Sequence, residues 1–206
     1  MKTIPAALTK HGEKVTSTYN LEPAVLTTGS VVNGTTILLT ERLPKGLVLQ
    51  PGQRRALAYR VVENGQPIVY ASYRSSGRLF GVYVKPWYLK GILKTKARMR
   101  NGYITVLAHE LSEMLVAPLL DQFTMPDSAG KSWRKEVCDP VLGAYYFENV
   151  NGQDCVFPDF VLPTFWDVNG KAPYSYMGTA KAPMVWAKGS YAWFRSALTR
   201  LTRVQF

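Results

Sequence analysis

The stretch that decides the fold is ITVLAHELSEMLVAPLL, residues 104–120. Apolar side chains recur in it at three- and four-residue spacing, which is typical of an amphipathic helix with a broad buried stripe. Pro118, near its end, removes a backbone donor and therefore allows or forces a late kink in the helix. The pattern predicts a central helix over 104–120 whose apolar face packs into a core.

The same helix carries the string HELSE, residues 109–113. Residues four apart lie one turn apart on the same face, so His109 and Glu113 can present an imidazole nitrogen and a carboxylate to one metal ion. In the related HExxH arrangement of zinc peptidases the two terminal residues bind the metal and the first Glu is the general base. Here Glu113 replaces the second histidine and Glu110 has the position of the base. A solvated helix face with a satisfied histidine at its edge produces the same string, so other parts of the chain must supply the context.

A third ligand is expected from a carboxylate, because two side chains are too few for a stable site. The chain's other histidine, His11, falls in residues 1–20, whose polar sequence without a clear period predicts an N-terminal arm. The segment KEVCDP, residues 135–140, offers Glu136 and Asp139, of which one can bind the ion while the other orients a ligand. The alternative is that this segment is an ordinary turn. Such a ligand set favours Zn²⁺ most simply, with Mn²⁺ or Ca²⁺ as alternatives.

The sequence before the helix is typical of strands, and the sequence after it is rich in proline, glycine and aromatic residues. We expect an α+β fold, with a β-rich amino-terminal half, the central helix, and an irregular carboxyl-terminal half that ends in a helix or strand from Tyr191 to Leu201. The expected strands are Ser30–Val32, Thr35–Thr40, Gly46–Gln50, Ala56–Val62, Pro67–Tyr73 and Leu79–Val84, with hairpin turns at Asn33-Gly34 and Asn64-Gly65.

Composition indicates a chain that folds. Of the 206 residues 47% are hydrophobic, 12% are aromatic and only 19% are charged, so enough apolar surface can be buried to offset the entropy of ordering. We expect one globular domain over residues 21–206 after the arm. No apolar run approaches the length of a membrane span, and two cysteines are too few for a disulfide scaffold.

The net charge of +11 favours acidic partners such as nucleic acid, an anionic surface or an acidic protein. Residues Lys85–Arg100 concentrate six basic side chains and no acidic one. This region is a candidate for DNA contact, with Trp87 and Tyr88 as stacking groups. The alternative is a solvated loop and helix edge, which we favour because no recognised nucleic-acid-binding motif accompanies the charges.

Four motifs follow one another in the chain: AHELSEML (108–115), EVCDPV (136–141), DFVLP (159–163) and KGSY (188–191). In this order they resemble those of an uncharacterised family of tailed-bacteriophage proteins, and the resemblance covers roughly Tyr73 to Ala192. The HExxE and EVCDP motifs are also similar to those of secreted zincin-like proteins related to plant exordium.

The resemblance implies a zincin-like fold in which His109 and Glu113 are metal ligands, Glu110 is the base, and Glu136 or Asp139 completes the site. It also implies a virion-associated structural protein of the head, neck or tail, found in the virion and, during assembly, in the host cytoplasm. Other phage structural proteins would then be its partners in an oligomeric assembly. A metal-dependent peptidase is the alternative function, and a basic nucleic-acid-binding protein is the second alternative.

This chain departs from the family pattern just after the helix. The pattern has Asp-Pro at that point, whereas this sequence has Ala117-Pro118. If the missing Asp helps to hold the metal, the site is weakened here, although Asp121 and Asp127 in the following segment offer replacement carboxylates.

Overall fold

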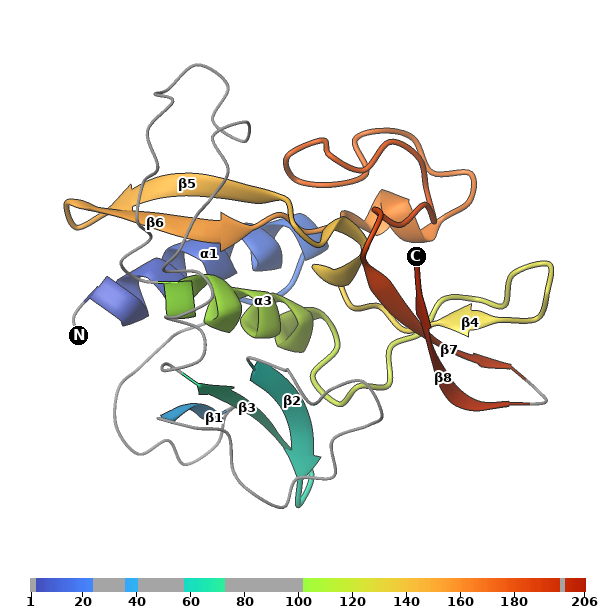
Figure 1. Cartoon of the computed structure of the whole chain (residues 1–206), viewed down its shortest axis with the longest axis horizontal. Helices are drawn as coiled ribbons and strands as arrows, with labels where there is room; N and C mark the ends of the chain where they lie inside the picture. The colour runs from blue at the N-terminus through green and yellow to red at the C-terminus, as the bar shows by residue number, and fades with distance from the viewer. Residues whose placement is uncertain (1–2, 24–35, 41–57, 73–101, 197–198) are drawn as a thin grey trace.

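The computed structural model describes residues 3–23, 36–40, 58–72, 102–196 and 199–206. It has the expected α+β architecture, built around two helices that lie side by side, α1 (Thr3–Tyr19) and α3 (Gly102–Val116). Figure 1 shows a small sheet on one side of this helix pair and a long hairpin on the other, with a second small sheet beyond the end of α3. Within the described ranges, neither helix is both long and apolar enough to cross a bilayer.

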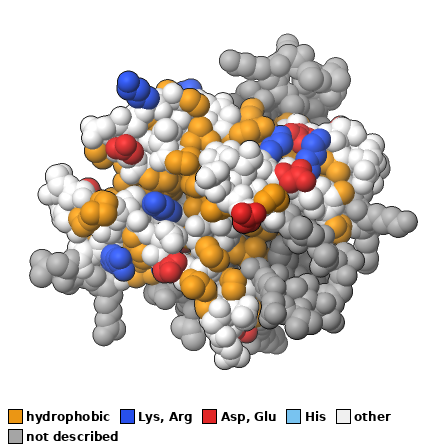
Figure 2. Space-filling model, turned by 180° about the vertical axis from the view of Figure 1, so that it is seen from behind, with side chains coloured by type: hydrophobic (Ala, Val, Ile, Leu, Met, Phe, Trp, Pro, Cys, Tyr) orange, Lys and Arg blue, Asp and Glu red, His pale blue; other side chains and the backbone are white. Residues whose placement is uncertain are grey.

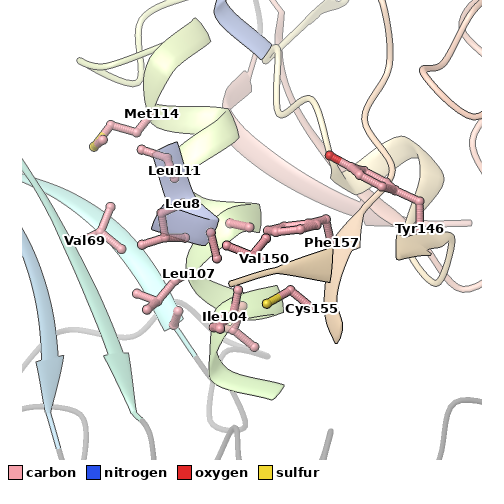
Figure 3. Packing of buried hydrophobic residues seen from close by; sticks show 14 residues of the cluster. Leu8, Val69, Ile104, Leu107, Leu111, Met114, Tyr146, Val150, Cys155 and Phe157 are labelled. Atoms are coloured by element: carbon pink, nitrogen blue, oxygen red, sulfur yellow. The ribbon is translucent and has the colours of Figure 1, made fainter. Parts of the chain in front are cut away.

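Helix α3 confirms the predicted central helix, but it ends four residues earlier, at Val116. The last helical hydrogen bond runs from the Ala117 amide to the Glu113 carbonyl, because Pro118 has no amide to continue the ladder. The helix buries side chains on several sides. Figure 3 shows Ile104, Leu107 and Leu111 packed against α1 and both flanking β elements.

The first twenty residues contain a packed helix, so the prediction of an irregular arm there was wrong. Helix α1 buries one stripe at helical spacing against α3 and the hairpin. The stripe was hidden in the sequence because half of its members are not hydrophobic. Its buried members are Ala7, Leu8, His11, Gly12, Val15 and Thr16.

The amino-terminal sheet has the strand order β1-β3-β2, with β1 at Thr36–Thr40, β2 at Ala58–Glu63 and β3 at Gln66–Ser72. The predicted hairpin at Asn64-Gly65 is confirmed, since β2 and β3 pair antiparallel and both turn residues have positive φ, 51° and 76°. The other expected strands, the Asn33-Gly34 turn and the basic stretch 85–100 lie outside the described residues.

A second Asn-Gly hairpin covers the opposite side of the helix pair. Strands β5 (Tyr145–Val150) and β6 (Gln153–Pro158) are joined by Asn151 and Gly152, whose φ angles are 52° and 76°. Phe157 on β6 is fully buried in the same core as α3. This signal was present in the sequence but lay in the half that we expected to be irregular.

The carboxyl-terminal sheet has the order β4-β7-β8, with β4 at Ser132–Trp133, β7 at Tyr191–Ser196 and β8 at Thr199–Gln205. The terminal segment is therefore a strand pair. Two short 3-10 helices, η3 (Asp139–Val141) and η4 (Pro163–Trp166), lie between β4 and β7 in the chain. Strand β7 contacts η3, and Figure 1 shows this sheet beyond the carboxyl-terminal end of α3.

Two glycines give opposite expectations for substitution by alanine. At Gly170 an added Cβ would lie 2.1 Å from the Thr164 carbonyl oxygen, so Gly170→Ala forces the backbone to move and should cost about 2–4 kcal/mol of stability. At Gly12 the Cβ would meet Leu115 and Leu111 at 3.7 and 3.8 Å, which is ordinary contact. Since Gly12 is inside a helix, Gly12→Ala should stabilise by up to about 1 kcal/mol. Urea unfolding of both variants measures whether each change raises or lowers the free energy of unfolding. A lower free energy of unfolding in Gly12→Ala would contradict this packing of α1 on α3.

Candidate metal centre

Three side chains from two elements converge on one point. His109 and Glu113 lie one turn apart on α3, and Asp139 is the first residue of η3. The Nε2 atom of His109 is 3.1 Å from Oε1 of Glu113 and 3.2 Å from Oδ1 of Asp139. One ligand atom from each residue lies within 4.8 Å of the others, so the three residues could hold one metal ion.

The segment that carries Asp139 is held in place by its neighbours in the sequence. Val137 and Cys138 are buried, and the Val137 carbonyl accepts a hydrogen bond of 2.8 Å from the Val161 amide. The Cys138 thiol faces the backbone carbonyl of His109 at 3.8 Å, which sets this segment beside the middle of α3. Cys138 lies outside the group of three ligands, and burial raises the pKa of its thiol above the usual range.

The two carboxylates are almost fully removed from water. The side chains of Glu113 and Asp139 are 5% and 3% exposed, and that of His109 is 16% exposed. Burial and the nearby Glu113 raise the pKa of Asp139 to about 6. Burial disfavours the charged imidazolium of His109, but the adjacent Glu113 and Asp139 outweigh it, so the pKa of His109 lies well above its usual value. The centre therefore attracts positive charge, as a cation site must.

Tyr191, the first residue of β7, borders the same centre. Its side chain is hydrogen-bonded to Asp139, and Asp139, burial and Glu113 together raise the pKa of its phenol well above the usual value. Glu110 and Glu136 contribute to the same shift, so both lie within electrostatic reach of the phenol. Arg203 of β8 lies over the ring, with its guanidinium carbon 4.1 Å from the ring centroid.

The remaining predicted site residues are placed differently. Glu136 is buried and lies 3.5 Å from the Arg134 guanidinium, outside the group of three. Glu110, next to His109 on α3, is partly exposed and is not in that group either. Of the two carboxylates that the sequence offered as third ligand, the structure brings Asp139 to His109. Their positions in the sequence do not distinguish the two carboxylates, because both lie in the same short segment.

His11 is the residue near the site that sequence reasoning missed. It is fully buried between the helices and the hairpin, and both ring nitrogens are engaged. Nδ1 is 2.7 Å from the Tyr146 hydroxyl, and Nε2 is 2.6 Å from Oγ of Ser112. Burial, chiefly, and the nearby charge of Lys14 lower the pKa of His11 to about 3, so the ring is neutral. His11 therefore belongs to the support of α3 and not to the ligand set.

Comparisons of the chain with protein-family models, with curated proteins and with solved structures found no match.

Proposed function

We propose that His109, Glu113 and Asp139 bind a divalent metal ion, most simply Zn²⁺, and that the site is a zincin-like centre for peptide hydrolysis. The observation that carries the proposal is the convergence of two buried carboxylates, one from α3 and one from η3, on a single imidazole nitrogen. Buried carboxylates facing one another are costly unless a cation neutralises them. An imidazole with two carboxylates is a donor set that zinc accepts, and three protein ligands leave a position for water or substrate.

The bound ion would polarise the scissile carbonyl and the attacking water. Glu110 is placed beside His109 on the same helix, where a carboxylate can take a proton from the attacking water and return it to the leaving amine as the C–N bond breaks. The phenol of Tyr191 stays protonated because of its acidic surroundings, so it remains a hydrogen-bond donor at the edge of the centre. Its one proton is donated to Asp139; if Asp139 bound a cation instead, the phenol could turn that proton to the negative oxygen that develops during attack.

A role in the virion, with other phage structural proteins as partners, stays a prediction from the resemblance. DNA contact through residues 85–100 also stays a prediction, because that stretch lies outside the described residues. On the face seen in Figure 2, the described Lys and Arg side chains are interspersed with Asp and Glu. That mixture does not favour a polyanion on this face, and it leaves the metal centre as the better-supported starting point.

The proposal is tested with the full chain and two single variants. After exchange against a mild chelator and excess Zn²⁺, mass spectrometry should find close to one zinc per wild-type chain and a large loss in Glu113→Gln. Glu110→Gln should keep its zinc, because Glu110 is not a ligand, but it should lose about 100-fold or more in the rate of peptide hydrolysis. Absence of zinc from the wild type would refute the metal site. Zinc without any Glu110-dependent hydrolysis would refute the peptidase and leave a structural ion.

A further inference from the structure

The buried pair of His11 and Ser112 joins α1 to the back of the helical turn that carries the metal ligands. Ser112 lies directly before Glu113, and its hydroxyl donates to the carbonyl of Ala108, 2.7 Å away. Ala108 lies directly before His109. The two residues that His11 holds in place are therefore the immediate neighbours of the two ligands on α3.

The donors and acceptors in this pair fix the state of the histidine. The Ser112 hydroxyl has one proton, and with that proton donated to Ala108 its oxygen is left to accept from His11, which corresponds to the tautomer with the ring proton on Nε2. Nδ1 then accepts from the Tyr146 hydroxyl. The resulting chain runs in one direction, from Tyr146 through His11 and Ser112 to the backbone of α3. If the ring became charged, Nδ1 would also carry a proton, and the Tyr146 hydroxyl would have to turn and accept it.

The surroundings leave the ring little freedom to move. His11 stacks on Phe157, with ring centroids 5.1 Å apart and planes 9° from parallel, and the edge of Phe160 closes a second side. The next residue, Gly12, faces Leu111 and Leu115 of α3, so α1 is packed against α3 at this turn as well. Packing thus restrains the histidine independently of its hydrogen bond to α3, so the ring can act as a rigid support.

We propose that His11 is a positioning residue for the metal centre, which sets the rotation of α3 through Ser112 and Ala108 and so directs His109 and Glu113 at Asp139. The proposal rests on the proposed metal site. A ligand atom on a helix lies roughly 6 Å from the axis, so a rotation of about 10° moves it by about 1 Å. Metal sites need their ligands held to about 0.5 Å, and residues that orient ligands commonly contribute 10- to 100-fold in affinity.

The chain offers a matched pair of variants that separates positioning from general stability. Ser112→Ala removes the bond from His11 toward α3, and Tyr146→Phe removes the bond of the same histidine on its far side. Ser112→Ala loses two buried hydrogen bonds, to His11 and to the Ala108 carbonyl, and Tyr146→Phe loses one. The expected losses of stability are therefore about 2–3 kcal/mol for Ser112→Ala and about 1–2 kcal/mol for Tyr146→Phe. Only Ser112→Ala should weaken zinc binding, by on the order of 10-fold, measured by competition with a coloured chelator at a temperature where both are folded.

Two further variants keep the proposal testable if Ser112→Ala does not fold. His11→Gln places an amide where Nε2 stood and should keep zinc affinity near that of the wild type, whereas His11→Asn places its amide near Nδ1 and should weaken it like Ser112→Ala. The chain has only two histidines, so ring ¹⁵N spectra of the metal-free protein can be assigned from the His11 variants alone. They should show His11 neutral with its proton on Nε2, and Ser112→Ala should shift the His109 signals while Tyr146→Phe leaves them in place.

The outcomes distinguish this proposal from the metal site itself. If the wild type binds no zinc, the proposed function has failed and this inference fails with it. If the wild type binds zinc and Ser112→Ala and Tyr146→Phe change the affinity equally, or not at all, the metal site stands and His11 is only a part of the core.

Discussion

Zinc at one hundred times its dissociation constant is expected to raise the free energy of unfolding by about 2.7 kcal/mol, and Asp139→Asn is expected to remove that gain. The reason is that the three ligands meet only in the folded chain, where η3 is docked on α3. An ion bound to them stabilises the folded state alone. Losing one of three ligands should weaken binding by 100-fold or more, so the same zinc concentration no longer saturates the site.

The matched control for this result is Glu136→Gln. Glu136 comes from the same segment as Asp139 and is also buried, but it lies beside Arg134 and outside the ligand group. Urea unfolding with zinc and with a chelator should therefore show the full zinc-dependent gain in Glu136→Gln. Equal loss of the gain in both variants would mean that the two carboxylates act together, and an undiminished gain in Asp139→Asn would mean that zinc binds elsewhere.

Acidification is expected to destabilise the metal-free protein through His11, by up to about 1.4 kcal/mol for each pH unit below 6.5. The pKa of His11 is lowered from 6.5 to about 3 in the folded chain. Between these values the unfolded chain takes up a proton that the folded chain does not, so stability falls as pH falls. The contribution of His11 is fully present above pH 6.5 and is lost as the pH falls to about 3. Besides Lys14 on its own helix, His109 of α3 opposes protonation, and the Tyr146 hydroxyl of β5 faces the ring.

The measurement compares wild type with His11→Gln, because other groups titrate in the same range. Asp139 acts in the opposite direction: its pKa is raised from 3.8 to about 6, so in that window its protonation stabilises the folded state as pH falls. The contribution of Asp139 is the same in both proteins, so it cancels in the difference between their free energies of unfolding. Wild type should lose stability more steeply than His11→Gln from pH 6.5 downward. Parallel curves would show that His11 becomes charged in the fold.

Local signals in the sequence predicted those parts of the fold that depend on neighbours in the chain. The stripe of α3 and the Asn64-Gly65 turn each rest on a few adjacent residues, and both appear in the structure, whereas the helix ends at Val116 and does not continue through a kink at Pro118. Helix α1 was missed because its buried stripe includes His11, Gly12 and Thr16, which read as polar or helix-breaking. These residues are buried because α3 and the hairpin supply their partners. A pattern of neighbouring residues does not predict contacts with such distant segments.

In the candidate site, too, one part is predicted by local sequence and the other depends on the tertiary structure. The spacing of His109 and Glu113 predicts one face of a helix, since a helical turn fixes that distance. The choice of Asp139 over Glu136 depends on how the segment after β4 turns back onto α3, through the Val137 carbonyl and the Cys138 thiol. Tyr191 joins the centre from β7, far along the chain, where only the tertiary arrangement brings it to Asp139.

The dependence of η3 on the start of β7 has a consequence for the order of events during synthesis on the ribosome. The Pro140 carbonyl accepts a hydrogen bond from the Ala187 amide, and β4 pairs with β7, so these contacts around η3 form only after residues beyond Ala187 have left the exit tunnel. Helix α3 with His109 and Glu113 is made much earlier. The surroundings of Asp139 are therefore completed later in synthesis than those of the two residues on α3.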